Sequence, residues 1–450
     1  MSSAAIAEQA AREAGPEGLA LVTRERSLML RFAAGRPTQS TAIDDATVEI
    51  AIPFGGHVGR AATNGVDDRS LAECAERARL AGRAAAAAGA GDFPGFDPDL
   101  GVGFDGSFDA ATAELDPATG AAALGETFET AGQYGLEAHG IWTVAEQEQA
   151  WATQDASGAE RRTDGFMKVI CIAPNGRSGY ASESAVAVSD VRPRDLAQRA
   201  AAKANAGGDP AELPPGEYTV VFEPQAVGWL ADLLAGCAFN GLAHAEGRGA
   251  LDGRLGDAVA APAINLSDSP RSGRTLPRSF DAEGTEKNPM PLIQDGVAQG
   301  VAHDLRSAAL AGAATTGHAL APGGDAAGPH PTNLVLAGGG AADEEELCAP
   351  VECGIYVTRL WYANAVRPKE TLITAVTRDG TFLIEDGKVT RPLRDLRLTD
   401  SVLGILSRTQ ALTREQRLTS DGEFYGRRFA YGVVCPALRA DAVRFTGAAG

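Results

Sequence analysis

Cysteine, basic residues and long apolar runs are all scarce in this 450-residue chain, and each shortage excludes a class of protein. The six cysteines are scattered, unlike the dense disulfide framework of a small secreted domain. No run approaches the ~18 apolar residues of a membrane-spanning helix. Residues 1–15 have neither the basic start nor the apolar segment of a signal peptide. The net charge of −19 argues against nucleic acid and anionic membranes as partners. We therefore expect a cytoplasmic protein.

Local motifs for nucleotide or metal binding are also missing. The glycine run 338–340 is followed by acidic residues at 343–346, whereas a phosphate-binding loop continues with Lys and then Ser or Thr. Cys348 and Cys353 are the only close pair of cysteines, and nothing comparable stands near them to complete a zinc site. The sequence therefore predicts no cofactor from a local pattern alone.

The length predicts two or three domains. A stretch rich in Gly, Pro and Asp at 89–107 is typical of a linker, and the turn-rich stretch 207–216 marks the clearest boundary. Residues 1–17 are expected to form a frayed helix before the first domain. The predicted domains are 18–88, 110–207 and 216–448.

In the first two domains, apolar alternation predicts strands and helical spacing predicts helices. Strands are expected at 19–22, 28–32, 47–52, 57–63, 141–144 and 166–172. Helices are expected at 67–88, 116–132 and 193–206, two of them with Pro in the first turn.

The third domain is organised around a strand at 218–222 that leads into a helix after Glu223 and Pro224. Apolar residues recur at helical spacing along it, at Val227, Leu230, Leu234 and Ala238. Asn240–Gly241 predicts the end of this helix. Short strands are expected at 263–266, 354–362, 370–376 and 381–384, hairpin turns at 379–380 and 386–387, and a long irregular loop at 311–343. The fold class is α+β: N-terminal mixed α/β domains precede a β-rich C-terminal domain with an embedded helix.

Six segments in order resemble those of the TldD/TldE (PmbA) family of metallopeptidases. They are 217–224 (EYTVVFEP), 279–285 (SFDAEGT), 292–297 (LIQDGV), 315–318 (TTGH), 331–334 (PTNL) and 384–392 (IEDGKVTRP). No single segment is specific, but six in the same order over this length are. The resemblance implies the family's fold and a role in proteolysis.

The catalytic motif of that family is absent from this chain. In the TldD half, the helix carries His-Glu-x-x-x-His, with two zinc ligands and a general base. Asp232, Leu233 and Cys237 occupy these positions here, and Gly422 stands where a late Cys ligand belongs, with Cys435 out of register. The resemblance is therefore to the TldE/PmbA half. It implies a non-catalytic subunit without a cofactor of its own, a TldD-like partner that holds the zinc, and unfolded or leader peptides as substrates.

Two alternatives remain open. The chain could be an active metal hydrolase with ligands outside the family pattern, such as Asp232, Cys237, His244 and Glu246. His244 and Glu246 would point to different faces of a helix but could converge in a loop, which makes them catalytic candidates. We interpret His318 as an ordinary hydrogen-bonded loop residue, which is more common than a histidine in a substrate cleft. The chain could also be a non-enzymatic peptide-binding or scaffold protein.

Overall fold

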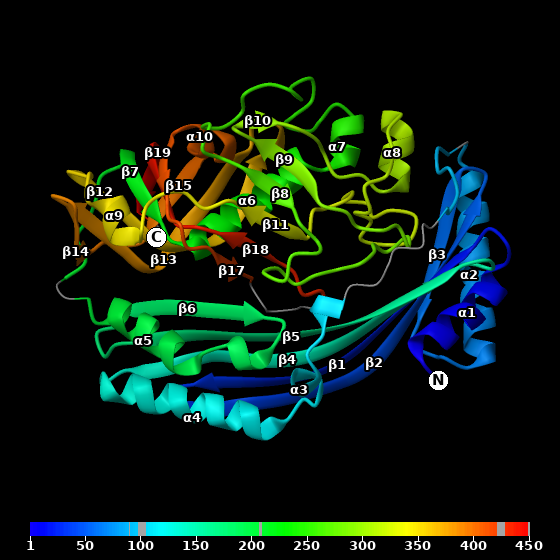
Figure 1. The fold of residues 1–450 in the computed structure, drawn as a ribbon, viewed down its shortest axis with the longest axis horizontal. Coiled ribbons are helices and arrows are strands. Elements are labelled where there is room, and N and C mark those ends of the chain that lie inside the picture. Colours follow the sequence, from blue (N-terminus) through cyan, green and yellow to red (C-terminus); the bar gives the residue numbers. More distant parts are fainter. Residues whose placement is uncertain (90, 98–104, 207–208, 421–427, 449–450) are drawn as a thin grey trace.

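A computed structural model describes residues 1–89, 91–97, 105–206, 209–420 and 428–448. The N-terminal half is built on one antiparallel six-stranded sheet in the order β3-β2-β1-β4-β5-β6 (Figure 1). Strands from 18–88 and from 110–207 thus share a single sheet. The strands are β1 (Leu19–Ala33), β2 (Arg36–Phe54), β3 (His57–Thr63), β4 (Glu137–Ala152), β5 (Ser157–Ile172) and β6 (Ser178–Ala185).

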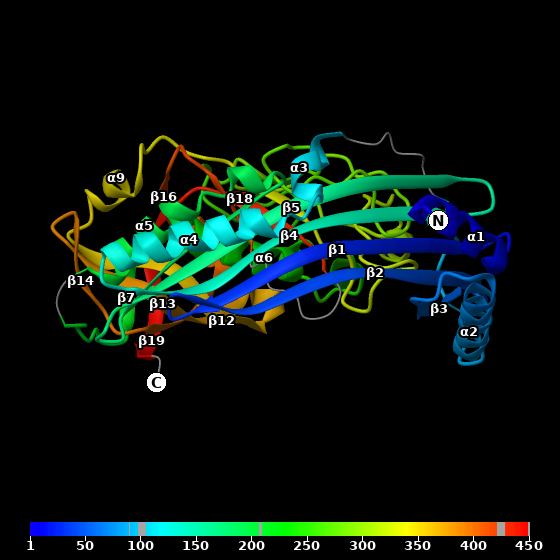
Figure 2. The same ribbon diagram turned by 90° about the horizontal axis from the view of Figure 1, so that it is seen from below.

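Four helices cover the outer face of this sheet in two pairs (Figures 1 and 2). At one end α1 (Ser3–Ala14) and α2 (Asp68–Ala86) pack on β1, β2 and β4, and at the other α4 (Pro117–Gln133) and α5 (Pro193–Ala204) pack on β1, β4 and β5. The helix predicted within residues 1–17 is present as α1, and it packs on the sheet instead of fraying. The Ser2 side chain caps α1, and α1 buries Ile6 and four alanines against the sheet. Shorter helical turns lie at Asp105–Ser107, Ala110–Ala113 (α3) and Val188–Asp190.

The inner face of the sheet is polar and buried, which explains why the sequence predicted its strands too short. The predicted strands 19–22 and 28–32 are one continuous β1, because the polar residues between them still pair with β2 and β4. Thr23, Glu25 and Ser27 are buried on this face beneath the C-terminal half. A polar run normally signals exposure, so burial against a second polar surface is not visible in the local pattern.

The C-terminal half contains a small barrel and a second sheet. The barrel follows the order β12-β7-β19-β15-β13 and closes because β12 also pairs with β13. Its strands are β7 (Gly216–Phe222), β12 (Cys353–Arg367), β13 (Leu372–Glu385), β15 (Leu396–Ser401) and β19 (Leu438–Ala448), with β14 (Lys388–Pro392) and β16 (Thr409–Leu412) attached. The second sheet, β10-β9-β8-β11-β18-β17, comprises β8 (Leu266–Asp268), β9 (Met290–Gln294), β10 (Val297–Ala298), β11 (Asn333–Leu336), β17 (Arg417–Thr419) and β18 (Gly432–Cys435).

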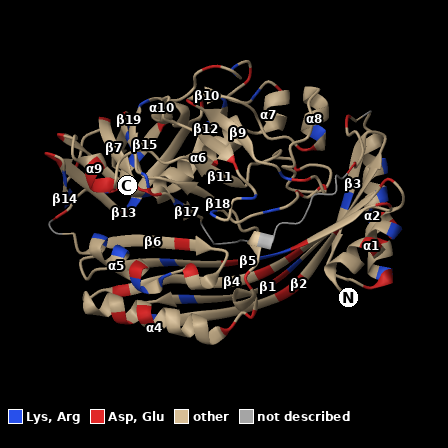
Figure 3. Ribbon diagram, viewed as in Figure 1, with Lys and Arg blue, Asp and Glu red and all other residues tan. Residues whose placement is uncertain are grey.

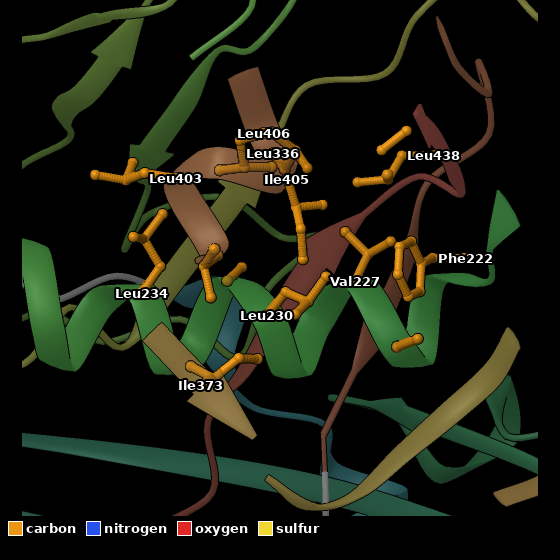
Figure 4. Packing of buried hydrophobic residues seen from close by; sticks show 14 of the residues in the cluster. Phe222, Val227, Leu230, Leu234, Leu336, Ile373, Leu403, Ile405, Leu406 and Leu438 are labelled. Atoms are coloured by element: carbon orange, nitrogen blue, oxygen red, sulfur yellow. The ribbon is translucent and has the colours of Figure 1, made fainter. Parts of the chain in front are cut away.

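Helix α6 (Pro224–Ala238) lies at the centre of the largest hydrophobic core, as the periodicity predicts. Val227, Leu230 and Leu234 contact side chains from the barrel strands and from α10 (Val402–Ser407), as Figure 4 shows. Each fully buried aliphatic side chain of this kind contributes about 1.5–3 kcal/mol. The predicted α+β class with a β-rich C-terminal part and an embedded helix is confirmed. The remaining short helices are α7 (Gly241–Ala245), α8 (Leu305–Ala311), α9 (Glu344–Cys348) and the turn Pro368–Glu370.

Two turn predictions had different outcomes. The turn at 386–387 connects β13 to β14 as expected. The turn predicted at 379–380 is wrong, because Asp379 and Gly380 lie inside β13, at an irregularity in its pairing with β12. Both residues have positive φ, and the Asp379 carboxylate accepts a 2.7 Å hydrogen bond from Arg359 Nε. Two residues that are typical of turns therefore form an irregularity that bends a continuous strand.

Candidate functional site around helix α6

Asp232 stands on the exposed side of α6 and is held by a histidine from a distant loop. Asp232 Oδ1 lies 3.1 Å from His330 Nε2, and both side chains are partly exposed. The His330 ring meets the Tyr431 ring edge-on, with centroids 5.9 Å apart. The carboxylate therefore orients the imidazole and leaves Nδ1 on its other side.

A cavity of about 530 Å³ opens beside this pair. It is lined more by apolar than by polar atoms, from Gly236, Asn240, Leu320, Ala327, Gly328, Pro329, His330, Phe429 and Tyr431. Asn240 shapes one wall, because its Nδ2 donates to the Ala327 carbonyl at 2.6 Å while its Oδ1 caps α7 at Ala243. This volume is within the range of small-molecule pockets.

Leu233 and Cys237 do not complete a polar site with Asp232. Leu233 packs against the main hydrophobic core. Cys237 is buried, and burial raises the pKa of its thiol. Asp232 is partly exposed whereas Cys237 is buried, so the two side chains face different sides of α6.

The described residues do not fit a catalytic zinc ion, which needs about three protein ligands and an open position for water. Asp232 and His330 provide two donors, and within the described ranges no group of three or more His, Cys, Asp or Glu is placed to hold a metal. Gly422 lies outside the described residues. Cys435 is buried, its thiol donates to the Pro224 carbonyl at 3.1 Å, and burial raises its pKa to about 12.

His244 and Glu246 point in different directions. His244 sits on α7 with Nδ1 buried and without a hydrogen-bond partner among the described residues. It lies close to His303, whose pKa is lowered by burial and then by the neighbouring His244. Glu246 is at the surface and pairs with Arg248. The structure brings neither of them together with Asp232 or Cys237 as a ligand group.

His318 belongs to a fully buried polar network rather than to the cavity wall beside α6. Its Nε2 lies 3.0 Å from Asp268 Oδ2, and its Nδ1 lies 2.9 Å from Thr316 Oγ1. Lys287 Nζ is 3.6 Å from the same carboxylate. Burial by itself would raise the pKa of Asp268, but Lys287 and His318 outweigh it and hold that pKa well below its usual range. The ionised Asp268 is therefore the centre of a neutralised cluster.

The same network connects several of the segments that carry the family resemblance. Asp281 accepts backbone hydrogen bonds from Glu283, Thr285 and Ala319. The Asn333 backbone N–H donates to Asp268 at 2.7 Å. Segments 279–285, 315–318 and 331–334 thus meet in the interior, so these motifs encode the fold around the site.

A buried ion pair fixes the segment after residue 427 to the inner face of the N-terminal sheet. Arg428 Nε donates to Asp164 Oδ1 at 3.1 Å, and its Nη2 contacts Asp164 and Thr143. The Arg428 carbonyl accepts from Gln147 Nε2 at 2.7 Å. The rings of Phe429 and Tyr431 that line the cavity are positioned by this contact between the two halves.

Sequence reasoning missed His330, Arg428 and Tyr431. For His330 the only local signal is its position directly before the 331–334 segment. Arg428 and Tyr431 follow Gly422, the position that corresponds to a family ligand, and have no sequence pattern of their own. All three act through contacts with residues far away in the sequence.

Comparisons with known proteins agree with this architecture. The family described as PmbA/TldA metallopeptidase C-terminal domain matches residues 215–447, just over half of the chain. A metalloprotease of Methanothermobacter thermautotrophicus is 24% identical over 205 residues, and a metalloprotease TldD homolog of Haemophilus influenzae is 25% identical over 280 residues. These matches cover 46% and 60% of this chain, and only 44% and 57% of the relatives' own lengths.

Solved structures share the fold over nearly the whole chain. TldE from Thermococcus kodakarensis superposes with a TM-score of 0.83 at 17% identity, covering 97% of this chain and 98% of that one. A putative modulator of DNA gyrase from Thermotoga maritima superposes with a TM-score of 0.78 at 20% identity, covering 97% of both chains. Within the described residues, no helix is long and apolar enough to span a bilayer.

Proposed function

Because this chain belongs to the TldD/TldE (PmbA) metallopeptidase family, we propose that it is a TldE-like subunit that works with a TldD-like metallopeptidase chain. The partner holds the zinc, and this chain forms part of the chamber in which unfolded or leader peptides are cleaved. The assembly is cytoplasmic and needs no cofactor on this chain.

The observation that carries the proposal is the chemistry of α6. Hydrolysis at zinc needs a carboxylate base close to the bound water. At that position this chain has Leu233, which is partly buried and packs against the core, and the first ligand position is occupied by Asp232, which is paired with His330. A chain with this helix can shape a site but has no carboxylate at position 233 to take a proton from a zinc-bound water.

The part that this chain plays is binding. The cavity beside α6 offers the aromatic rings of Phe429 and Tyr431 and the oriented imidazole of His330. Apolar walls with a few fixed polar groups are typical of sites that hold a ligand in one orientation. We propose that the cavity receives an apolar side chain of the peptide, while zinc on the partner supplies the activated water.

Cleavage of an unfolded peptide by this chain alone, by a TldD-like chain alone and by the mixture tests the proposal. We expect activity in the mixture only, with loss of that activity after chelation. Activity of this chain alone would contradict the proposal and favour the hydrolase with other ligands. No activity in any arm would also contradict it and favour a non-enzymatic scaffold.

A further inference from the structure

A second cavity, here called the polar cavity, lies between the inner face of the N-terminal sheet and the C-terminal half, the two surfaces that face each other in Figure 1. Its volume of about 20 Å³ is enough for about one or two water molecules, so a group that binds there must be small. Four cationic side chains and two amides line it, all more than nine-tenths buried: Arg162, Arg278, Lys287, Arg428, Gln147 and Gln149.

The cations face the polar cavity, whereas the carboxylates that pair with three of them lie behind. Arg162 pairs with Glu160 at 2.6 Å, Lys287 with Asp268 at 3.6 Å and Arg428 with Asp164 at 3.1 Å. These carboxylates are not among the lining residues of the cavity. The pairs offset the cost of burying the cations. Because the cations are nearer to the cavity than their partners are, the potential inside it favours a negative group.

Asp281 is the carboxylate among the described lining residues, and the backbone engages both of its oxygens. Its Oδ1 accepts from the N–H groups of Glu283 and Thr285 at 2.9 and 3.0 Å, and its Oδ2 accepts from that of Ala319 at 2.9 Å. Asp281 therefore fixes two backbone segments and leaves the cationic side chains on the opposite side to an incoming group.

Gln149 adds a neutral donor to these cations. Its Oε1 accepts from Arg162 Nη2 at 3.0 Å, which assigns the orientation of the amide. The Nε2 group then remains as a donor at the cavity, and it makes no hydrogen bond with a described residue. Guanidinium and amide N–H groups that converge on a small buried space are well suited to bind a carboxylate.

The polar cavity adjoins the cavity beside α6. Leu320, His330 and Phe429 line both of them. The Arg278 guanidinium stacks on the Phe429 ring, 4.1 Å from its centroid, and its Nη2 donates to the Ala430 carbonyl at 2.5 Å. A single ligand can therefore place an apolar group in one cavity and a negative group in the other, past a shared wall of three side chains.

We infer that the polar cavity binds the carboxylate of a peptide whose apolar side chain occupies the cavity beside α6. This site deepens the proposed function and rests on it, because a peptide is the ligand. The end of the peptide chain is the source of the carboxylate that fits best. A C-terminal residue carries its side chain and its carboxylate on one Cα, as two cavities with a shared wall require. In an extended peptide, an acidic residue next to the apolar one points to the opposite side.

Three N-terminally fluorescein-labelled peptides test this site on the wild-type chain alone, by fluorescence anisotropy. The first ends in Phe with a free carboxylate, the second is the same peptide with a C-terminal amide, and the third is amidated with Asp before the Phe. We expect amidation to weaken binding about tenfold to a hundredfold, because charge-assisted hydrogen bonds are lost. Recovery of affinity in the third peptide would support the carboxylate site and assign it to an acidic side chain. Equal affinities for all three, or no binding of any, would overturn it.

Gln149→Glu places a carboxylate in the polar cavity with little change of shape. We expect the peptide with the free carboxylate to bind at least about tenfold more weakly to this variant, because the two negative groups repel each other. The amidated peptide should bind as it does to wild type. Gln198→Glu, at an exposed position of α5, adds the same charge elsewhere and should change neither affinity. An equal loss for both peptides would show that Gln149 acts on the fold and would contradict its place in the site.

The two proposals can fail separately, because binding is measured on this chain alone and cleavage on its mixture with a TldD-like chain. Cleavage in the mixture together with equal binding of the free and amidated peptides would overturn the carboxylate site only. Carboxylate-dependent binding without cleavage in the mixture would support the site and contradict the proposed subunit role.

Discussion

Asp232 and His330 are 98 positions apart in the chain, yet their side chains meet at 3.1 Å beside α6. In the metal-binding helix of the TldD half of the family, a zinc ligand stands at the position that corresponds to Asp232. Here the residue anchors the loop that forms one wall of the cavity. A position that could hold a metal therefore supports the wall of a cavity in this chain.

The buried and the half-exposed histidine–aspartate pairs are predicted to differ in their effect on stability. His318→Ala leaves the fully buried Asp268 with fewer partners and is expected to lower the free energy of unfolding by about 3 kcal/mol. His330→Ala breaks a partly exposed pair and is expected to cost less than about 1 kcal/mol. Urea denaturation of both variants checks this, and equal losses would contradict it.

The contact between the two halves is predicted to depend on Arg428. Arg428→Ala leaves Asp164 buried without its cation, and we expect a loss of about 3–5 kcal/mol. Arg24→Ala breaks an exposed pair with Asp44 in the charged middle of the sheet, visible in Figure 3, and should cost under about 1 kcal/mol. Thermal unfolding measures both, and a small effect of Arg428→Ala would show that this ion pair does not fix the interface.

Glu283 is predicted to make stability fall as pH rises. Burial, and then the charge of Asp281, raise its pKa well above the usual value, and Oε1 has no hydrogen-bond partner among the described residues. A folded pKa above the unfolded one gives a contribution that is complete below the unfolded pKa and is lost as pH rises through the folded pKa.

Glu283→Gln removes this titration, so the variant should gain stability relative to wild type between about pH 5 and pH 8. The exposed Glu73, substituted in the same way, serves as the control for removing a surface carboxylate. Melting temperatures across this range test the prediction. A difference between Glu283→Gln and wild type that is constant with pH would contradict the assignment.

The aromatic wall of the cavity is predicted to affect peptide binding in the reconstituted complex. Tyr431→Ala removes a ring that lines the cavity and supports His330, so kcat/KM of the mixture should fall, mainly through a higher KM. Tyr134→Ala, at the exposed end of α4, should leave both constants unchanged. Similar values for the two variants would show that the cavity is not used.

Much of the fold could be predicted because local patterns agree with it. The apolar spacing of Val227, Leu230 and Leu234 predicted α6, and the Asp386–Gly387 pair predicted the turn after β13. The length of β1 could not be predicted, since its polar middle is buried only through contact with the other half. Asp379 and Gly380 are residue types typical of turns, but here they bend a strand. They do so because β13 continues to pair with β12 on both sides of them.

The candidate site was predictable only in part. The sequence places Asp232 and Cys237 on one helix. That their side chains face different sides could not be predicted, because it depends on the burial of Cys237 in the folded chain. His330 reaches Asp232 and Tyr431 reaches His330 from two distant segments, and no local spacing connects the three residues. Contacts of this kind are properties of the folded chain.

Zinc content measured on the separate chains and on their complex tests the central claim most directly. We predict close to no zinc in this chain after purification and exposure to zinc, and one zinc per pair once a TldD-like chain is bound. Asp232→Ala should not change either value. One equivalent of zinc bound tightly to this chain alone, and lost in Asp232→Ala, would contradict the account.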